Sequence, residues 1–299
     1  MTGRPLRHWL LLFALVAMWG SSFLLTKIAV TAFSPTNIVA WRMVIGATML
    51  VILLAAIRRA WPRGLRLWSF FLGMAIVGNC LPFWLISWGQ RAIDSGLAGI
   101  LMAIMPPTTL VLAHFFVAGE RLTPARVAGF LVAFAGVVVL MGPEVLLEIG
   151  GTKTALLSEL AMLGAAICYA VAAIMARVGP RGDALGRSLG VALLGVVVMM
   201  PLALATGEAW TPRVGIEAAI ALGLLGLFST GIAMIVYFRL IAEAGPTFMS
   251  LINYLIPLWA LVLGVVALDE RPTWHALIAL VLVLSGIALS ERKARSPAR

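Results

Sequence analysis

Charged side chains are scarce in this chain of 299 residues, where Asp, Glu, Lys and Arg together make up 11% of the sequence. An ordinary soluble domain carries about 25%. Hydrophobic residues account for 62%, and no polar stretch between the apolar runs is long enough to fold as a separate domain. This composition excludes a water-soluble enzyme or binding domain and predicts an integral membrane protein.

Acidic groups are missing from the predicted membrane interior, because all twelve carboxylates fall in loops or at the ends of apolar runs. A membrane-embedded Asp or Glu is the usual proton carrier of a coupled transporter. We interpret His114, near the inner end of its span, as a helix-end residue rather than a proton relay. The chain also lacks a His-Glu-x-x-His pair and a close Asp-Asp dyad. We therefore expect no enzymatic activity, no cofactor, no metal site and no strict proton coupling.

Cysteine is equally rare. Cys80 and Cys168 each lie inside an apolar run, so the sequence implies neither a disulfide nor a thiolate metal site. We interpret both as small packing residues.

Long apolar runs are what the sequence has in abundance. A helix needs about 20 apolar residues to cross a bilayer, and ten such stretches follow one another along the chain. They lie at 8–30, 36–57, 67–89, 94–117, 124–143, 157–177, 184–206, 215–239, 246–268 and 273–290. The first resembles a signal peptide, but it is too long and lacks a cleavage site, so we interpret it as a retained helix.

The distribution of basic residues predicts the orientation of these spans. With the N-terminus inside, sixteen Lys and Arg residues fall in inner segments and five in outer segments, which is a clear positive-inside bias. Both termini are therefore expected in the cytoplasm of a bacterial cell with the spans in its inner membrane. The net charge of +10 reflects this topology and attraction to anionic lipid, so we expect no nucleic-acid partner.

The second half of the chain is a weak repeat of the first at an offset of 150 residues. Pro107 matches Pro257, and Glu120-Arg121-x-Thr123 matches Glu270-Arg271-x-Thr273. Five spans is an odd number, so the second half must enter the bilayer upside down, as in many secondary transporters. We predict an all-α membrane protein of ten transmembrane helices, built as two inverted five-helix repeats at 1–150 and 151–299.

Residues that disturb a helix gather on the same three spans of each half, and a membrane site needs such irregular backbone. We therefore expect spans 1, 3, 4, 6, 8 and 9 to be interrupted and to line a central cavity, with Pro82, Pro107 and Pro257 as hinges. The disturbed positions are Gly20-Ser21-Ser22, Gly78-Asn79 with Pro82, Pro106-Pro107, Cys168-Tyr169, Ser229-Thr230-Gly231 and Pro257. The other four spans should face lipid and pack closely through small residues.

Aromatic rings and neutral polar groups occupy the central positions of those six spans. Rings can stack on the apolar body of a solute while dipoles bind its head, which favours a neutral or zwitterionic organic molecule over a sugar or a metal ion. We predict that the substrate is bound by Trp19, Ser22, Asn79, Phe83, Trp84, Met102, Tyr169, Ser229, Tyr237, Asn253 and Tyr254.

Three polar residues leave alternatives open. Asn79 and Asn253 could instead form hydrogen bonds between helices. Arg42, a lone cation within span 2, either extends to the outer interface or turns inward to a carboxylate or a helix end.

Several of these residues together resemble one family. Trp19-Gly20-Ser21-Ser22-Phe23, Arg42, Pro106-Pro107 followed by Glu120-Arg121-Leu122-Thr123-Pro124, and Pro257 followed by Glu270-Arg271-Pro272-Thr273 are similar to the EamA-type drug/metabolite transporters. The resemblance covers the whole chain and is greatest to bacterial amino-acid exporters, including the aromatic amino-acid exporter. The second half has Tyr169-Ala170-Val171-Ala172 in place of the Trp-Gly-Ser-Ser run, so we do not expect a symmetric site.

The resemblance implies export of a small metabolite, foremost an amino acid, by alternating access through a central cavity. The partners are then a small-molecule substrate and the lipid bilayer, and no oligomer is required. The alternatives are a related exporter of another metabolite or drug-like solute, and a membrane receptor or assembly factor, which needs no cavity.

Overall fold

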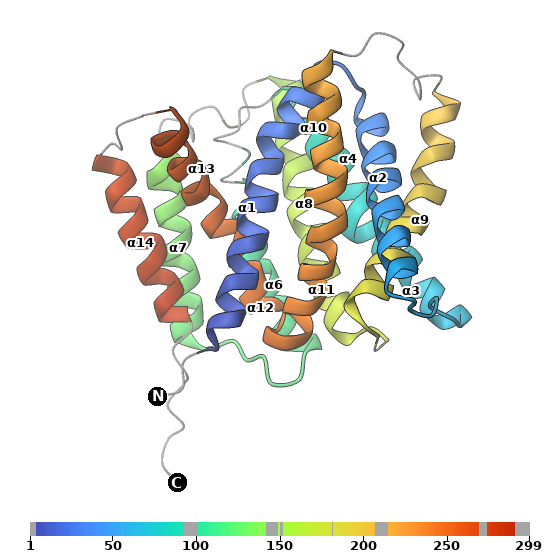
Figure 1. Ribbon diagram of the computed structural model, residues 1–299. Helices are drawn as coiled ribbons and strands as arrows, with labels where there is room; N and C mark the ends of the chain where they lie inside the picture. Colours follow the sequence, from blue (N-terminus) through green and yellow to red (C-terminus); the bar gives the residue numbers. More distant parts are fainter. Residues whose placement is uncertain are drawn as a thin grey trace.

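A computed structural model describes residues 4–92, 98, 101–141, 149, 152–180, 182–206, 215–268 and 274–290. The described residues form helices and connecting turns, with no β-strand among them (Figure 1). The helical segments, two of them π-helical (η), are α1 (Leu6–Ala29), α2 (Pro35–Ala56), α3 (Leu65–Ala75), η1 (Ile76–Cys80), α4 (Leu81–Gly89), α6 (Met105–Phe116), α7 (Pro124–Met141), α8 (Lys153–Val178), α9 (Ala184–Ala205), α10 (Ile216–Gly226), η3 (Leu227–Ile232), α11 (Ala233–Ala244), α12 (Pro246–Ser250), α13 (Ile252–Leu268) and α14 (Trp274–Ser290).

These segments form ten transmembrane helices in the described part of the chain. Six are long and apolar enough to cross a bilayer by length and composition: α1, α2, α3 to α4, α8, α9, and α10 to α11. The four shorter ones, α6, α7, α12 to α13, and α14, occupy the predicted fourth, fifth, ninth and tenth spans. Where the structure describes them, the predicted ends are close, except that α8 begins at Lys153 rather than at 157 and α11 continues to Ala244 rather than stopping at 239. The predicted ends at 94, 143 and 273 lie outside the described residues.

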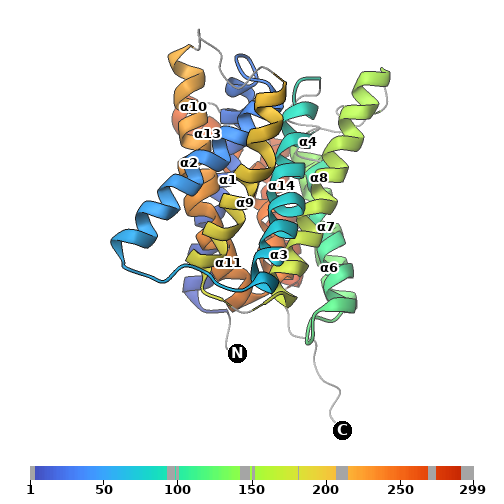
Figure 2. The same ribbon diagram turned by 90° about the vertical axis from the view of Figure 1, so that its right-hand side faces the viewer.

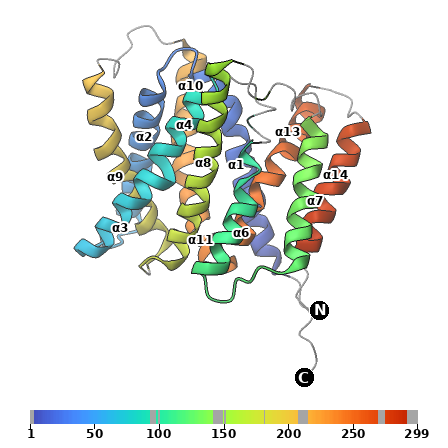
Figure 3. The ribbon, with the colours of Figure 1, turned by 180° about the vertical axis from the view of Figure 1, so that it is seen from behind.

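The ten helices are arranged as two inverted five-helix repeats, as predicted. α1 and α8, which open the two repeats, run in opposite directions through the bundle (Figures 1 and 3). The packing repeats as well, because α1 contacts α10 and α13 while α8 contacts α4 and α6. α2 pairs with α9, and α7 pairs with α14, so each pair joins equivalent helices of the two halves.

These two pairs stand at the flanks of the bundle. Figure 1 shows α7 and α14 at one side, and Figure 2 looks onto the opposite side, formed by α2, α3 and α9. The spans that the sequence assigns to the cavity lie between them. This leaves the centre of the bundle to spans 1, 3, 4, 6, 8 and 9.

α7 and α14 approach so closely that their backbones touch. A Cβ atom added to Gly286 would lie 2.5 Å from the carbonyl oxygen of Gly129 and 2.5 Å from the amide nitrogen of Ala133. A Cβ atom added to Gly136 would lie 2.8 Å from Cγ2 of Val283. Small residues allow such contact between membrane helices, which is the role that the sequence predicts for these spans.

Helix interruptions occur in four of the six central spans. The π-helical segments η1 and η3 interrupt spans 3 and 8 at positions related by the 150-residue offset. In span 4, α6 begins at Met105, so that Pro106 and Pro107 fall in its first turn, where a missing amide donor costs little. In span 9, Leu251 separates α12 from α13.

The predicted breaks in spans 1 and 6 are wrong, because α1 and α8 are continuous helices. In α1 the small residues serve close packing instead. A Cβ atom at Gly20 would lie 2.8 Å from Cδ1 of Trp259, and Ser21 accepts a hydrogen bond of 3.2 Å from Nε1 of Trp259. Gly20 and Ser21 therefore join α1 to α13 without interrupting α1.

The close contact between α7 and α14 predicts the effect of adding one methyl group. Gly286→Ala should lower the melting temperature of the purified protein by a few degrees, because overpacking costs about 1–3 kcal/mol. Gly223→Ala is the matched control, since a Cβ atom there meets nothing within 4 Å and alanine favours a helix over glycine. Equal melting temperatures for the two variants, measured by thermal unfolding in detergent, would contradict this packing.

Candidate functional site

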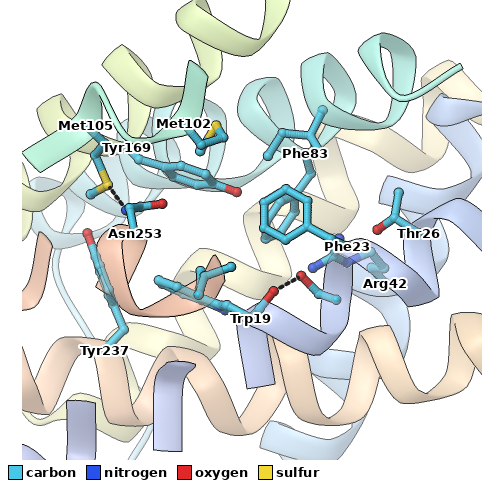
Figure 4. A pocket seen from close by; sticks show the side chains of 13 residues that line it. Trp19, Phe23, Thr26, Arg42, Phe83, Met102, Met105, Tyr169, Tyr237 and Asn253 are labelled. Atoms are coloured by element: carbon cyan, nitrogen blue, oxygen red, sulfur yellow. Dashed lines mark hydrogen bonds between the residues drawn. The ribbon is translucent and has the colours of Figure 1, made fainter. Parts of the chain in front are cut away.

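A cavity lies at the centre of the bundle, between the two repeats (Figure 4). All six central spans contribute to its wall, and α2 adds one residue. The lining residues are Trp19, Ser22, Phe23, Thr26, Arg42, Phe83, Ile86, Met102, Met105, Tyr169, Tyr237, Asn253 and Ile256. The space open to the centre of a water molecule is about 40 Å³, enough for a few waters. A solute as large as an amino acid needs the cavity to widen.

Aromatic rings form the largest part of the wall. Trp19 of α1 and Tyr169 of α8, which are equivalent positions of the two repeats, stack with centroids 6.3 Å apart and an interplanar angle of 14°. Tyr237 lies 5.7 Å from Trp19, and Phe83 lies 6.3 Å from Tyr169. We call these four side chains the ring cluster. Its flat faces can stack on an apolar or aromatic body, and they can also hold a cation.

The π-helical segment η3 fixes the position of Trp19. The indole Nε1 of Trp19 donates a hydrogen bond of 3.0 Å to the backbone carbonyl of Ser229. The hydroxyl of Ser229 donates in return to the carbonyl of Met18, at 2.8 Å. The irregular backbone thus supplies an acceptor to a side chain, and the Trp19 ring is locked at the junction of α1 and η3.

Arg42 turns inward to the cavity and is only 3% exposed. Its Nε donates a hydrogen bond of 3.2 Å to Oγ1 of Thr230 in η3, and its Cζ lies 3.8 Å from the ring centroid of Phe83. Gly46 permits this approach, since a Cβ atom there would lie 3.1 Å from Cγ2 of Thr230. Extension to the outer interface is therefore the wrong alternative. The inward alternative holds, but with a hydroxyl and a ring as partners.

Asn253 and the methionines close the opposite wall. The side-chain amide of Asn253 donates to the sulfur of Met105 at 2.7 Å. This contact joins α13 to α6, and Figure 4 shows it beside Tyr237. Pro257 lies inside α13, one turn after Asn253. Because proline has no amide hydrogen, the backbone carbonyl of Asn253, four residues earlier, receives no i+4 hydrogen bond within the helix.

Seven of the eleven predicted binding residues lie on the cavity wall. They are Trp19, Ser22, Phe83, Met102, Tyr169, Tyr237 and Asn253. Their part in substrate binding stays a prediction.

The other four lie behind the wall and bond to the bundle itself. The amide of Asn79 donates to the carbonyl of Met74 in its own span, Trp84 donates to Thr36, and Tyr254 donates to the carbonyl of Phe130. Ser229 supports Trp19 from behind. Phe83 and Asn253 line the cavity, whereas the next residue in each helix, Trp84 or Tyr254, does not.

Five lining residues besides Arg42 were absent from the predicted set: Phe23, Thr26, Ile86, Met105 and Ile256. Four of them follow helical spacing from residues that were predicted. Phe23 lies four positions after Trp19, Thr26 lies four after Ser22, and Ile86 and Ile256 lie three after Phe83 and Asn253. Residues three or four apart share a helix face, so this spacing could have located them.

Two basic side chains occupy equivalent places at opposite ends of the bundle. Lys27, near the end of α1, donates to the carbonyl of Gln90 at 3.1 Å. Arg177, near the end of α8, donates to the carbonyls of Ile241 and Ala242 at 3.3 and 2.7 Å. Each joins the first helix of its repeat to the end of the third span of the same repeat. A second hollow, lined by Arg177 and Arg187 among others, opens at the end where α8 and α11 finish.

A solvent-sized cavity between two inverted repeats of a membrane helix bundle is the architecture of a secondary transporter. The sequence comparison agrees, because the EamA-like transporter family matches residues 7–142 and again residues 156–292. The chain belongs to this family. The fold is shared with a solved crystal structure, with a TM-score of 0.75 at 22% identity over 95% of this chain and 97% of the other.

Curated relatives are named as transporters. A probable terminal-alkyne amino-acid exporter of Streptantibioticus cattleyicolor is 27% identical, over 93% of this chain and 91% of the relative. The aromatic amino acid exporter YddG of Ancylobacter novellus is 29% identical over 65% of this chain and 67% of its own length. The uncharacterized transporter YoaV of Bacillus subtilis is 22% identical over 91% and 92%.

Trp19 lines the cavity and Trp84 does not, so replacing each by alanine should affect transport differently. Trp19→Ala removes the centre of the ring cluster and should reduce solute flux in proteoliposomes by about tenfold or more, since a stacked ring contributes about 0.5–1.5 kcal/mol beyond its buried area. Trp84→Ala should leave flux within about twofold, because Trp84 bonds to Thr36 outside the cavity. The melting temperature of each variant serves as the control for folding. Equal flux losses would contradict the assignment of the wall.

Proposed function

We propose that this protein is a bacterial inner-membrane exporter of small amphipathic metabolites, foremost amino acids and including aromatic ones. The observation that carries the proposal is the ring cluster at the junction of the two repeats, with neutral polar groups and one cation beside it. Such a wall suits a solute with an apolar body and a polar head. The names of the relatives support amino acids as the first class to test.

Transport in this proposal follows the gradient of the solute, without a proton carrier in the membrane. None of the described residues that line the cavity is Asp, Glu or His. His114 lies away from it, and its Nδ1 accepts a hydrogen bond from the amide of Leu122 in the following loop. The protein itself carries out no chemical reaction on the solute in this proposal.

Alternating access is the proposed mechanism, with the cavity open to one side at a time. The narrow cavity of this structure would widen when spans 3, 4, 8 and 9 move about the points where their helices are interrupted. Pro82 lies in the first turn of α4, just after η1, Pro107 lies in the first turn of α6, and Pro257 lies within α13. A proline weakens the local helical hydrogen bonding, so we propose these three residues as hinges.

Counterflow tests the proposed activity. Proteoliposomes loaded with unlabelled phenylalanine should take up labelled phenylalanine transiently, and protein-free liposomes should not. An imposed proton gradient should leave the final level unchanged. Accumulation well above the external concentration under a proton gradient would overturn the uncoupled mechanism. Exchange of only other metabolites or drug-like solutes would favour the related exporter, and exchange of no solute would favour a receptor or assembly factor.

The orientation of the termini can be tested with cysteines at the two ends of the bundle. Thr31 follows α1 and Arg59 follows α2, so they lie on opposite sides of the membrane. In a background without Cys80 and Cys168, Thr31→Cys should react with an impermeant maleimide on intact spheroplasts. Arg59→Cys should react only after permeabilisation. The opposite labelling pattern would place both termini outside and contradict the positive-inside assignment.

A further inference from the structure

Arg42 is a buried cation in a wall that contains no acid. Its side chain is almost fully removed from the surface, and all the other described residues that line the cavity are uncharged. No described carboxylate lies within the 4.0 Å of an ion pair with it. A buried charge is costly unless it is paired, so the site retains a charge that the described part of the protein does not neutralise.

The guanidinium group of Arg42 also has N–H donors that no described residue accepts. An arginine carries five N–H donors in a planar fork. Among the described residues, only the Nε of Arg42 has a hydrogen-bond partner, Oγ1 of Thr230, while Phe83 covers one face of the group. The two terminal nitrogens are left to the cavity. A planar fork with free terminal nitrogens matches the two oxygens of a carboxylate.

The position of Arg42 relative to the ring cluster defines an orientation for a bound molecule. Figure 4 shows Arg42 beyond Phe83 at one end of the cavity, with Tyr169, Tyr237 and Asn253 toward the other end. One amphipathic molecule could therefore place an anionic head at Arg42 and its apolar body on the rings. An ammonium group would need no acid, because ring faces attract cations.

We infer that Arg42 binds the carboxylate of the transported solute, and that the substrate class is an organic acid or amino acid with an apolar or aromatic body. The inference rests on the proposed function, since it assigns one end of the same cavity. A purely structural role, in which Arg42 only joins α2 to η3 through Thr230, makes a different prediction. Its removal would then weaken all ligands alike through loss of folding.

Four probes that share one ring but differ in charge separate these roles: phenylalanine, 3-phenylpropionate, phenylalaninamide and 2-phenylethylamine. Binding to the full-length protein in nanodiscs is measured by calorimetry. Arg42→Gln should weaken the two carboxylates by about ten- to a hundredfold, the range for a hydrogen bond to a charged group. The amide and the amine should change by less than about twofold. Arg42→Lys, which keeps the charge but loses the fork, should fall between them.

The matched control is Arg126→Gln. Arg126 forms an ion pair of 2.8 Å with Glu120 and does not line the cavity, so its removal should leave all four affinities unchanged. If Arg42→Gln does not fold, Arg42→Lys still distinguishes acids from amides. Equal losses for acids and amides, or no loss, would overturn the inference, as would a wild type that binds neither carboxylate.

The outcomes for the two proposals can be told apart. Carboxylate binding that depends on Arg42, without amino-acid counterflow, would leave this site standing and overturn the proposed export. Counterflow of phenylalanine with unchanged binding in Arg42→Gln would do the reverse.

Discussion

The hydrocarbon core of a bilayer offers no hydrogen-bond partner to a backbone amide or carbonyl, so every irregular turn inside it must be satisfied by the protein. This constraint governs the centre of the structure. In η1 the side-chain amide of Asn79 donates to the backbone carbonyl of Met74, and in η3 the hydroxyl of Thr230 donates to the backbone carbonyl of Leu225. Both bonds reach back five residues, to a carbonyl in the last turn of the α-helix that precedes the π-helical segment. The same segments then support the cavity wall, because η3 also holds Trp19 and Arg42.

The cavity combines an approximate symmetry with one clear departure from it. The stacked pair of Trp19 and Tyr169 joins equivalent positions of the two repeats. Lys27 and Arg177 make equivalent contacts within their own repeats, at opposite ends of the bundle. Arg42 has no such counterpart, since Ala192 occupies its equivalent place. In the proposed alternating access, similar walls would let the two halves exchange roles, whereas the single charged group at Arg42 would distinguish the two ends of a bound solute.

The spans, their inversion and the central six helices could be predicted from the sequence, because length, charge bias and repeat offset are properties of whole segments. The wall was harder to predict, because it depends on the rotation of each helix about its own axis. Asn79 and Trp84 lie in the correct span, yet their side chains bond to neighbouring parts of the protein outside the cavity wall. The small residues of α1 predict a break, but only the structure shows that Gly20 is required by Trp259. Arg42 could not be placed until α2 was seen to pack on η3.

A π-helical turn holds about one residue more than an α-helical turn, and η1 and η3 each contribute that surplus to their span. The surplus fixes the rotational phase of everything that follows. In an uninterrupted α-helix successive residues advance by about 100° around the axis, so the same residues wound as a regular α-helix at η1 or η3 would turn the rest of the span by about that angle. Phe83 and Ile86 would leave the cavity in the first case, and Tyr237 in the second. The chemistry of the wall thus depends on the winding of the helix at two points as strictly as on which residues line it.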